Sequence, residues 1–136
     1  MPGEEIESLQ AQAATLIEQG QATEALKIYE QICASSKATA ADHYNRANLL
    51  HTLGKLEEAL QSLHTTVALE PGHAQAWHMA GALNGLVNRP EVAADCFRKT
   101  LELLPHATET RLNLAHALLQ MGQREAAIME CKRATE

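Results

Sequence analysis

The stretch Ala74–Pro105, AQAWHMAGALNGLVNRPEVAADCFRKTLELLP, decides the fold of this chain. Its parts 74–87 and 90–104 each have the length and apolar spacing of a helix of about 14 residues. Pro90 falls in the first turn of the second part, where a missing N–H costs nothing. Pro105 closes that part, because proline disfavours a helical residue before it. The stretch therefore predicts two antiparallel helices joined by a tight turn.

The same pattern recurs along the chain with a step of 34 residues. The step relates the turn residues Gly20, Gly54, Asn88 and Gly122, and five residues later it relates Ala25, Ala59, Ala93 and Ala127. Asparagine replaces glycine at 88 without breaking the register, because it too tolerates the left-handed conformation that ends many helices. The step divides the chain into repeats 6–39, 40–73, 74–107 and 108–136, the last one shorter than the others.

A period of about 34 residues is typical of tetratricopeptide arrays, and residues 6–136 resemble that family. The third repeat matches the family pattern most fully, through Trp77, Gly81, Ala93, Phe97 and Pro105. His43 and Arg111 stand at the tryptophan place of the second and fourth repeats. The resemblance implies an all-α fold, a right-handed α-solenoid of antiparallel helix pairs. We expect a single array over residues 1–136, with four repeats and about eight helices.

Small residues recur where the two helices of a repeat are expected to face each other. The eighth place of the first helix is Ala13, Ala47, Gly81 or Ala115. Opposite it stand the alanines of the 34-residue step, and small side chains at both places let two backbones approach closely. Larger apolar residues are expected to fill the space around them, namely Leu16, Leu50, Leu118, Tyr29, Leu63 and Phe97. We interpret all of these residues as core.

Composition excludes several classes of partner. Lys and Arg number 11 against 17 Asp and Glu, a net charge of −6, whereas nucleic acids and anionic membranes require a basic face. No apolar run approaches the roughly 20 residues that span a bilayer. Cys33, Cys96 and Cys131 are odd in number and form no Cys-x-x-Cys pair, which fits a reducing, cytoplasmic location.

The family resemblance implies that the first helix of each repeat lines a concave groove that binds a peptide or partner segment. Helical spacing puts the second, fifth, sixth, ninth and twelfth places of that helix on one side. These places form the groove stripe: Glu7, Gln10, Ala11, Ala14, Ile17, Ala41, Tyr44, Asn45, Asn48, His51, Gln75, His78, Met79, Ala82, Gly85, Glu109, Leu112, Asn113, His116 and Leu119. Our candidate partner-binding residues within it are Tyr44, Asn45, Asn48, His51, His78, Asn113 and His116.

The stripe contains no lysine or arginine. The best-known family members hold acidic tails with such cations in this groove, and charge-assisted bonds to a carboxylate require them. Gln10, Gln75 and Met79 stand where cations would be wanted, which argues against a carboxylate clamp there.

A second resemblance concerns asparagine. The runs Asn45–Ala47 and Asn113–Ala115 are similar to the asparagine ladder of O-linked N-acetylglucosamine transferases, which implies contact with a substrate backbone. An amide can donate to and accept from such a backbone. Ala11 and Met79 interrupt the ladder, and the asparagines could equally cap local backbone groups.

Motifs of catalysis and metal binding are missing from the sequence. It has no Gly-rich phosphate loop and no Gly-x-Ser-x-Gly, so we expect a non-catalytic protein without a cofactor. His51, His78 and His116 could point into the groove, but no His-x-x-x-His pair supports a metal site. Hydrogen bonding to a partner, or a solvated polar surface, accounts for them.

The fourth repeat reaches Glu136 inside its second helix, without the solvating helix that usually covers the last repeat. Ala127, Ile128 and Cys131 are then expected to face solvent or whatever follows. Two alternatives to the scaffold arise from this edge. The chain could be the N-terminal module of a larger transferase, or a structural spacer that self-associates through its C-terminal repeat.

Overall fold

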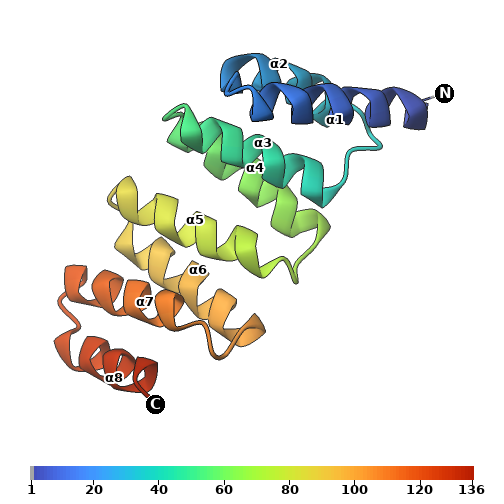
Figure 1. The fold of residues 1–136 in the computed structure, drawn as a ribbon. Coiled ribbons are helices and arrows are strands. Elements are labelled where there is room, and N and C mark those ends of the chain that lie inside the picture. Colours follow the sequence, from blue (N-terminus) through green and yellow to red (C-terminus); the bar gives the residue numbers. More distant parts are fainter. Residues whose placement is uncertain (1) are drawn as a thin grey trace. The chain divides into compact units, whose positions relative to one another are not determined.

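The structure is a computed structural model that describes residues 2–136, with side chains from Glu5 onward. The described residues form eight helices and no strand, which confirms the all-α class and the helix pairs (Figure 1). The helices are α1 Pro2–Glu18, α2 Ala22–Cys33, α3 Ala40–Thr52, α4 Leu56–Leu69, α5 Ala74–Leu86, α6 Pro90–Leu103, α7 Thr108–Gln120 and α8 Arg124–Ala134. They fall into two compact units, Met1–Pro71 and Gly72–Glu136. The four repeat ranges remain a prediction from the sequence.

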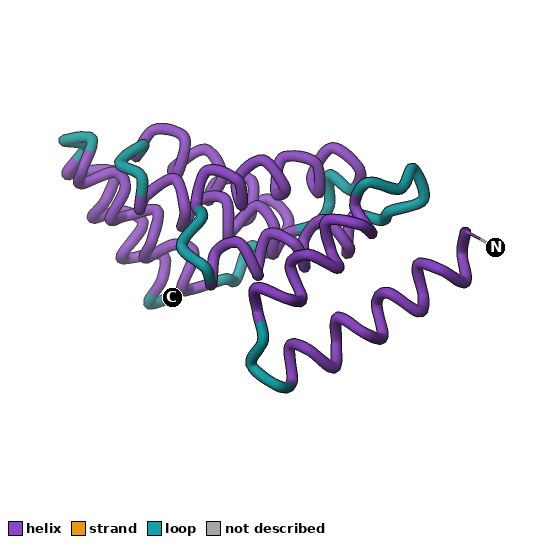
Figure 2. Tube along the Cα trace, turned by 90° about the horizontal axis from the view of Figure 1, so that it is seen from above, coloured by secondary structure: helices purple, strands orange, loops and turns teal. Residues whose placement is uncertain are grey.

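Each unit contains two helical hairpins packed on each other. In the first unit α1 packs on α2, α2 on α3 and α3 on α4. In the second unit α5 packs on α6, α6 on α7 and α7 on α8. The hairpin of α1 and α2 is easily followed beside the N label in Figure 2. Consecutive hairpins of a unit therefore share a packed face through α2 and α3, or through α6 and α7.

The four hairpin turns have the same geometry. Gly20, Gly54, Asn88 and Gly122 have φ values of 74°, 77°, 63° and 77°, so the predicted left-handed turn is confirmed at all four. In the third repeat Arg89 N–H donates to the Asn84 carbonyl at 2.8 Å. The corresponding bonds elsewhere join Gln21 to Leu16, Lys55 to Leu50 and Gln123 to Leu118. This six-to-one bond caps carbonyls that the helix end would otherwise leave unpaired.

The predicted small residues line the hairpin interiors. Ala13, Ala25, Ala47, Ala59 and Ala93 are completely buried, and Ala115 and Ala127 nearly so. A Cβ added to Gly81 would lie 2.5 Å from Cε1 of the buried Phe97 ring. Glycine at this place therefore lets the ring approach the α5 backbone. In the second unit, Phe97 of α6 and Leu118 of α7 belong to one buried cluster.

Three details of the core differ from expectation. Leu16 is only half-buried. Ala127 is 2% exposed because it packs into the Phe97 cluster, which confirms its predicted core place and corrects the expectation that the missing last helix would leave it facing solvent; Ile128 and Cys131 are exposed as expected. Asn84 takes the place that leucine holds in the other repeats, and it is buried with its amide donating to the Ala80 carbonyl at 2.8 Å. The internal bond makes a buried amide tolerable there.

Candidate partner-binding site

The groove stripe is accessible along all four first helices. None of its residues is buried in the structure. The eighth place, on another side of the same helices, is buried in each of them. The helical periodicity thus separates a packed side from an open side, as helices of 3.6 residues per turn require.

The candidate residues differ in exposure. Asn45, His51 and His116 are exposed, whereas Tyr44, Asn48, His78 and Asn113 are half-buried. In the first unit, four candidates lie together along α3. In the second unit, His78 lies on α5, and Asn113 and His116 lie one helical turn apart on α7.

The two asparagines of the proposed ladder have different surroundings. The Asn45 amide donates to the Tyr29 hydroxyl at 3.2 Å, so one of its N–H groups is already used. Asn113 and Phe97 stand at the places that match Asn45 and Tyr29, and phenylalanine offers no hydroxyl. Within residues 5–136, the Asn113 amide has no hydrogen-bond partner. Its donors and its carbonyl are therefore available to a ligand.

His78 has a structural role that its sequence place did not suggest. Its Nδ1 lies 2.9 Å from the hydroxyl of Thr110, which belongs to α7. Its ring also contacts Phe97, with centroids 5.7 Å apart. His78 is therefore held between helices of the second unit, and less of it is free for a partner than of His116.

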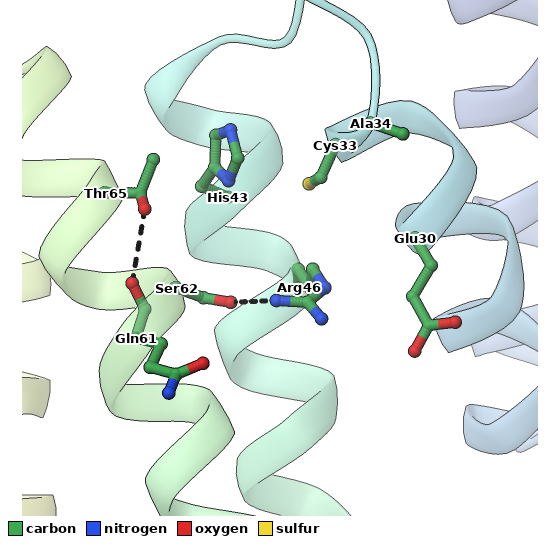
Figure 3. Close-up of a pocket in the computed structure, with 8 residues that line it drawn as sticks. All are labelled: Glu30, Cys33, Ala34, His43, Arg46, Gln61, Ser62 and Thr65. Atoms are coloured by element: carbon green, nitrogen blue, oxygen red, sulfur yellow. Dashed lines mark hydrogen bonds between the residues drawn. The ribbon is translucent and has the colours of Figure 1, made fainter.

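A pocket of about 340 Å³ opens in the first unit, between α2, α3 and α4 (Figure 3). Its lining residues are Glu30, Cys33, Ala34, His43, Arg46, Gln61, Ser62 and Thr65. Arg46 Nη1 donates to Ser62 Oγ at 2.6 Å, and the serine is 2% exposed. His43 and Arg46 occupy the fourth and seventh places of α3, on the opposite side of the helix from the groove stripe.

The pocket lies where the second repeat has polar residues at two places that later repeats fill with apolar ones. His43 stands at the place of Trp77 in the third repeat, and a histidine fills less space than a tryptophan. Arg46 stands at the place of Leu114, which is buried in the fourth repeat. Polar groups thus replace packing residues at two places of one helix. The sequence already shows His43 at the tryptophan place, but the polar seventh place escaped our sequence analysis.

Charge in the pocket is concentrated on one arginine. Burial lowers the pKa of His43 below its ordinary 6.5, and the nearby Arg46 lowers it further, so the imidazole is neutral at pH 7. Burial raises the pKa of Cys33 to about 11, so its sulfur remains a thiol. Arg46 is left as the cation of the pocket, and Glu30 supplies a carboxylate at its outer wall.

A second pocket, of about 480 Å³, lies beside Arg111 and Pro105 in the second unit. Arg111 also replaces tryptophan, but its charge is neutralised. Its Nη1 is 3.0 Å from the Glu130 carboxylate, and its Nη2 donates to the Pro105 carbonyl at 2.9 Å. Arg133 contacts the same Glu130 at 3.0 Å. Arg111 therefore links α8 to the turn before α7, and its guanidinium is already paired within the protein.

The structure also bears on membrane crossing and on metal binding. None of the described helices is long and apolar enough to cross a membrane. Between Glu5 and Glu136, no group of three or more His, Cys, Asp or Glu side chains is arranged to hold a metal ion.

Comparison with known proteins shows the family. Models of the tetratricopeptide repeat match residues 16–83 and 108–136. The first match alone covers half of the chain, so the chain belongs to the tetratricopeptide repeat family. Membership in this family supports a role as a scaffold for protein–protein interaction.

Solved structures of MamA proteins share this fold. MamA 41-end from Desulfovibrio magneticus RS-1 matches with a TM-score of 0.90 at 19% identity, over 98% of this chain and 76% of that one. A MamA RS-1 double mutant matches with a TM-score of 0.92 at 19% identity, over 98% and 75% of the two chains. Another MamA crystal structure gives 0.89 at 18% identity, over 96% and 76%. Likeness at this level of identity establishes the fold and nothing about ligands.

Proposed function

We propose that this protein is a non-catalytic scaffold that binds an extended segment of a partner protein along the groove stripe. Family membership supports the scaffold role. The observation that carries the site is the Asn113 amide, which is half-buried on α7 and unbonded within the described chain. A half-buried amide contributes most to the free energy of binding when a ligand backbone supplies the hydrogen-bond donor and acceptor that the protein does not.

The neighbours of Asn113 suit an extended segment. Leu112 and Leu119 are 48% and 53% exposed and offer apolar contacts on the same helix. His116 is exposed one turn beyond the asparagine and adds a polar group. A strip that alternates apolar and amide groups can hold a polypeptide by its backbone and bury some of its side chains. This arrangement is also what the likeness to the asparagine ladder of O-linked N-acetylglucosamine transferases implies.

The first unit offers its own set of candidate residues on α3, namely Tyr44, Asn45, Asn48 and His51. Asn45 keeps one N–H and its carbonyl after bonding Tyr29, so it can still make two bonds to a backbone. We expect it to contribute less than Asn113, because part of its capacity is used internally.

A peptide selection on the full chain tests this proposal. Peptides selected from a displayed library would be assayed by fluorescence anisotropy against Asn113→Ala, Asn45→Ala and the double variant. Loss of one or two backbone bonds should weaken binding by about 3–10-fold per asparagine. Gln31→Ala is the matched control, since Gln31 is exposed on α2, away from the stripe. Equal affinities for wild type and double variant, at unchanged helicity, would remove the asparagines from the site.

One alternative is also favoured by a specific observation. Ile128 and Met129 of α8 are 48% and 50% exposed, which suits the self-associating spacer. Sedimentation velocity across a concentration series decides it, with Ile128→Lys/Met129→Lys as the comparison. A wild type that stays monomeric throughout excludes the spacer. The transferase-module alternative is tested separately, by whether the native reading frame continues beyond Glu136 into an enzyme domain.

A further inference from the structure

We propose that the pocket between α2, α3 and α4 binds a carboxylate group through Arg46. This site is separate from the groove stripe, because Arg46 and His43 lie on the opposite side of α3. It needs neither the ladder asparagines nor the groove ligand, so either proposal can fail without the other.

The bonding of Arg46 leaves most of its donors unused. The side chain is half-buried, and Ser62 Oγ is its hydrogen-bond partner in the described part of the chain. A guanidinium carries five N–H donors, and a partly buried cation that makes no ion pair is costly. Arg111 and Arg98, by contrast, each pair with a carboxylate, at 3.0 and 3.2 Å. No described Asp or Glu makes such a pair with Arg46.

Ser62 gives the site a fixed geometry. Its hydroxyl accepts the Nη1 bond at 2.6 Å from a serine that is almost fully buried. One side of the guanidinium is thereby anchored against α4, and Figure 3 shows Arg46 between Ser62 and the α2 wall. A planar carboxylate can accept parallel bonds from the donors that remain.

The surrounding charges favour a carboxylate over a phosphate. His43 is neutral at pH 7 and adds no positive charge, so the pocket offers one cation. The Glu30 carboxylate at the outer wall, the charge of Asp42 near Cys33 and His43, and the net charge of −6 repel an anion that carries two charges. A volume of about 340 Å³ suits one acidic side chain, a chain terminus or a small free acid.

Amide spectra of the full chain test the site directly. ¹⁵N-labelled protein would be titrated at pH 7 and constant ionic strength with sodium acetate, sodium phosphate, Ac-Gly-Glu-Gly-NH₂ and the matching Gln peptide. We expect saturable shifts at Arg46, Gln61 and Ser62 with acetate and the Glu peptide. A peptide that binds tighter than acetate identifies a polypeptide carboxylate, and equal binding identifies a free acid. Tighter binding of phosphate, or equal binding of the Gln peptide, would overturn the proposal.

Arg46→Leu is the decisive variant, because leucine occupies the matching place in the fourth repeat and should keep the fold. Carboxylate binding should fall at least about tenfold, since a charge-assisted bond is lost. Arg111→Leu, at the other replaced tryptophan place, is the control that should leave the shifts unchanged. A second measurement needs no substitution in the pocket. In Cys131→Ser protein, saturating acetate should slow alkylation of the pocket thiol Cys33 but not that of Cys96, and unprotected Cys33 contradicts the site.

Discussion

Gln10 Nε2 donates a 2.6 Å hydrogen bond to Asp42 Oδ1 and so joins the first helices of two successive repeats. His78 and Thr110, each 68 residues further on, make the corresponding connection at 2.9 Å. In both pairs the fifth place of one helix reaches the third place of the next. Asp42 and Thr110 are each 2% exposed, so both links are shielded from water on one side. The two units therefore contain the same polar link, built from different side chains.

Asp42→Ala should lower the free energy of unfolding by about 2–4 kcal/mol. The carboxylate accepts from Gln10 and from Thr39 N–H at 2.9 Å, and Thr39 Oγ1 accepts from Asp42 N–H in return. The change removes a capping box and leaves the half-buried Gln10 amide unpaired. Thr39→Ala is the control, because it removes the cap and keeps the Gln10 link, at a cost of about 1 kcal/mol. Urea titration followed by circular dichroism measures both, and equal losses would show that the link contributes nothing.

Two glycines of α5 should respond oppositely to alanine. Gly81→Ala places a Cβ 2.5 Å from the Phe97 ring, and we expect a net loss of about 1–2 kcal/mol after the gain in helix propensity. Gly85→Ala meets no atom within 4 Å and should raise stability by about 0.5–1 kcal/mol. Thermal unfolding of the two variants gives the comparison. A stabilised Gly81→Ala would mean that Phe97 moves aside without cost.

The third prediction concerns the left-handed turn residue Gly122. Gly122 has a φ of 77°, so Gly122→Ala should cost about 1–2 kcal/mol, whereas Gly122→Asn should cost less because Asn88 already adopts this conformation. Gly72→Ala is the control, since Gly72 does not have a positive φ and no atom lies near its Cβ position. Chemical unfolding of the three variants should rank them in that order of loss. Similar losses at Gly72 and Gly122 would count against a conformational cause.

The three thiols should react at different rates. Cys131 is exposed, whereas Cys33 is half-buried and Cys96 is buried. Burial raises the pKa of Cys33 and of Cys96 to about 11, and the thiolate is the reactive species. At pH 8, iodoacetamide should therefore modify Cys131 first. Modification of Cys33 should accelerate about tenfold per pH unit as long as the pH stays below that pKa. Peptide mass mapping over time gives the rates, and a fast Cys33 at pH 8 would contradict the raised pKa.

The sequence predicted the helices and turns well because both depend on local chemistry. Gly54 and Asn88 end helices through the conformations that their own backbones allow, and the register carries that information from repeat to repeat. The buried alanines were equally predictable from the sequence, since only small side chains fit between two close helices. Asn84 could not be foreseen as buried, because its amide is satisfied by its own helix and no pattern of apolar residues records that bond.

The candidate site was less predictable because it depends on contacts between repeats. Helical spacing placed Asn45 and Asn113 on the same stripe, but only the structure shows that the Asn45 amide donates a hydrogen bond to the Tyr29 hydroxyl. Phe97, at the place that matches Tyr29 in the third repeat, has no hydroxyl to make such a bond with Asn113. Helical spacing predicted His78 as a groove residue. It could not predict the bond to Thr110, because that bond depends on how α5 packs against α7. The Arg46 pocket needs three helices to form, so periodicity along one helix could not reveal its volume.

The attachment of α8 has a dynamic consequence. Among its residues in the structure, Ala127 alone is buried, and the Arg111–Glu130 ion pair supplies the main polar tie to α7. Local opening exposes little apolar surface, so the free energy of opening α8 should lie well below that of α6 and α7. Its amide protons should therefore exchange with solvent first. Added salt should quicken that exchange by weakening a partly exposed ion pair, so ionic strength would set how long this face of the fourth repeat stays closed.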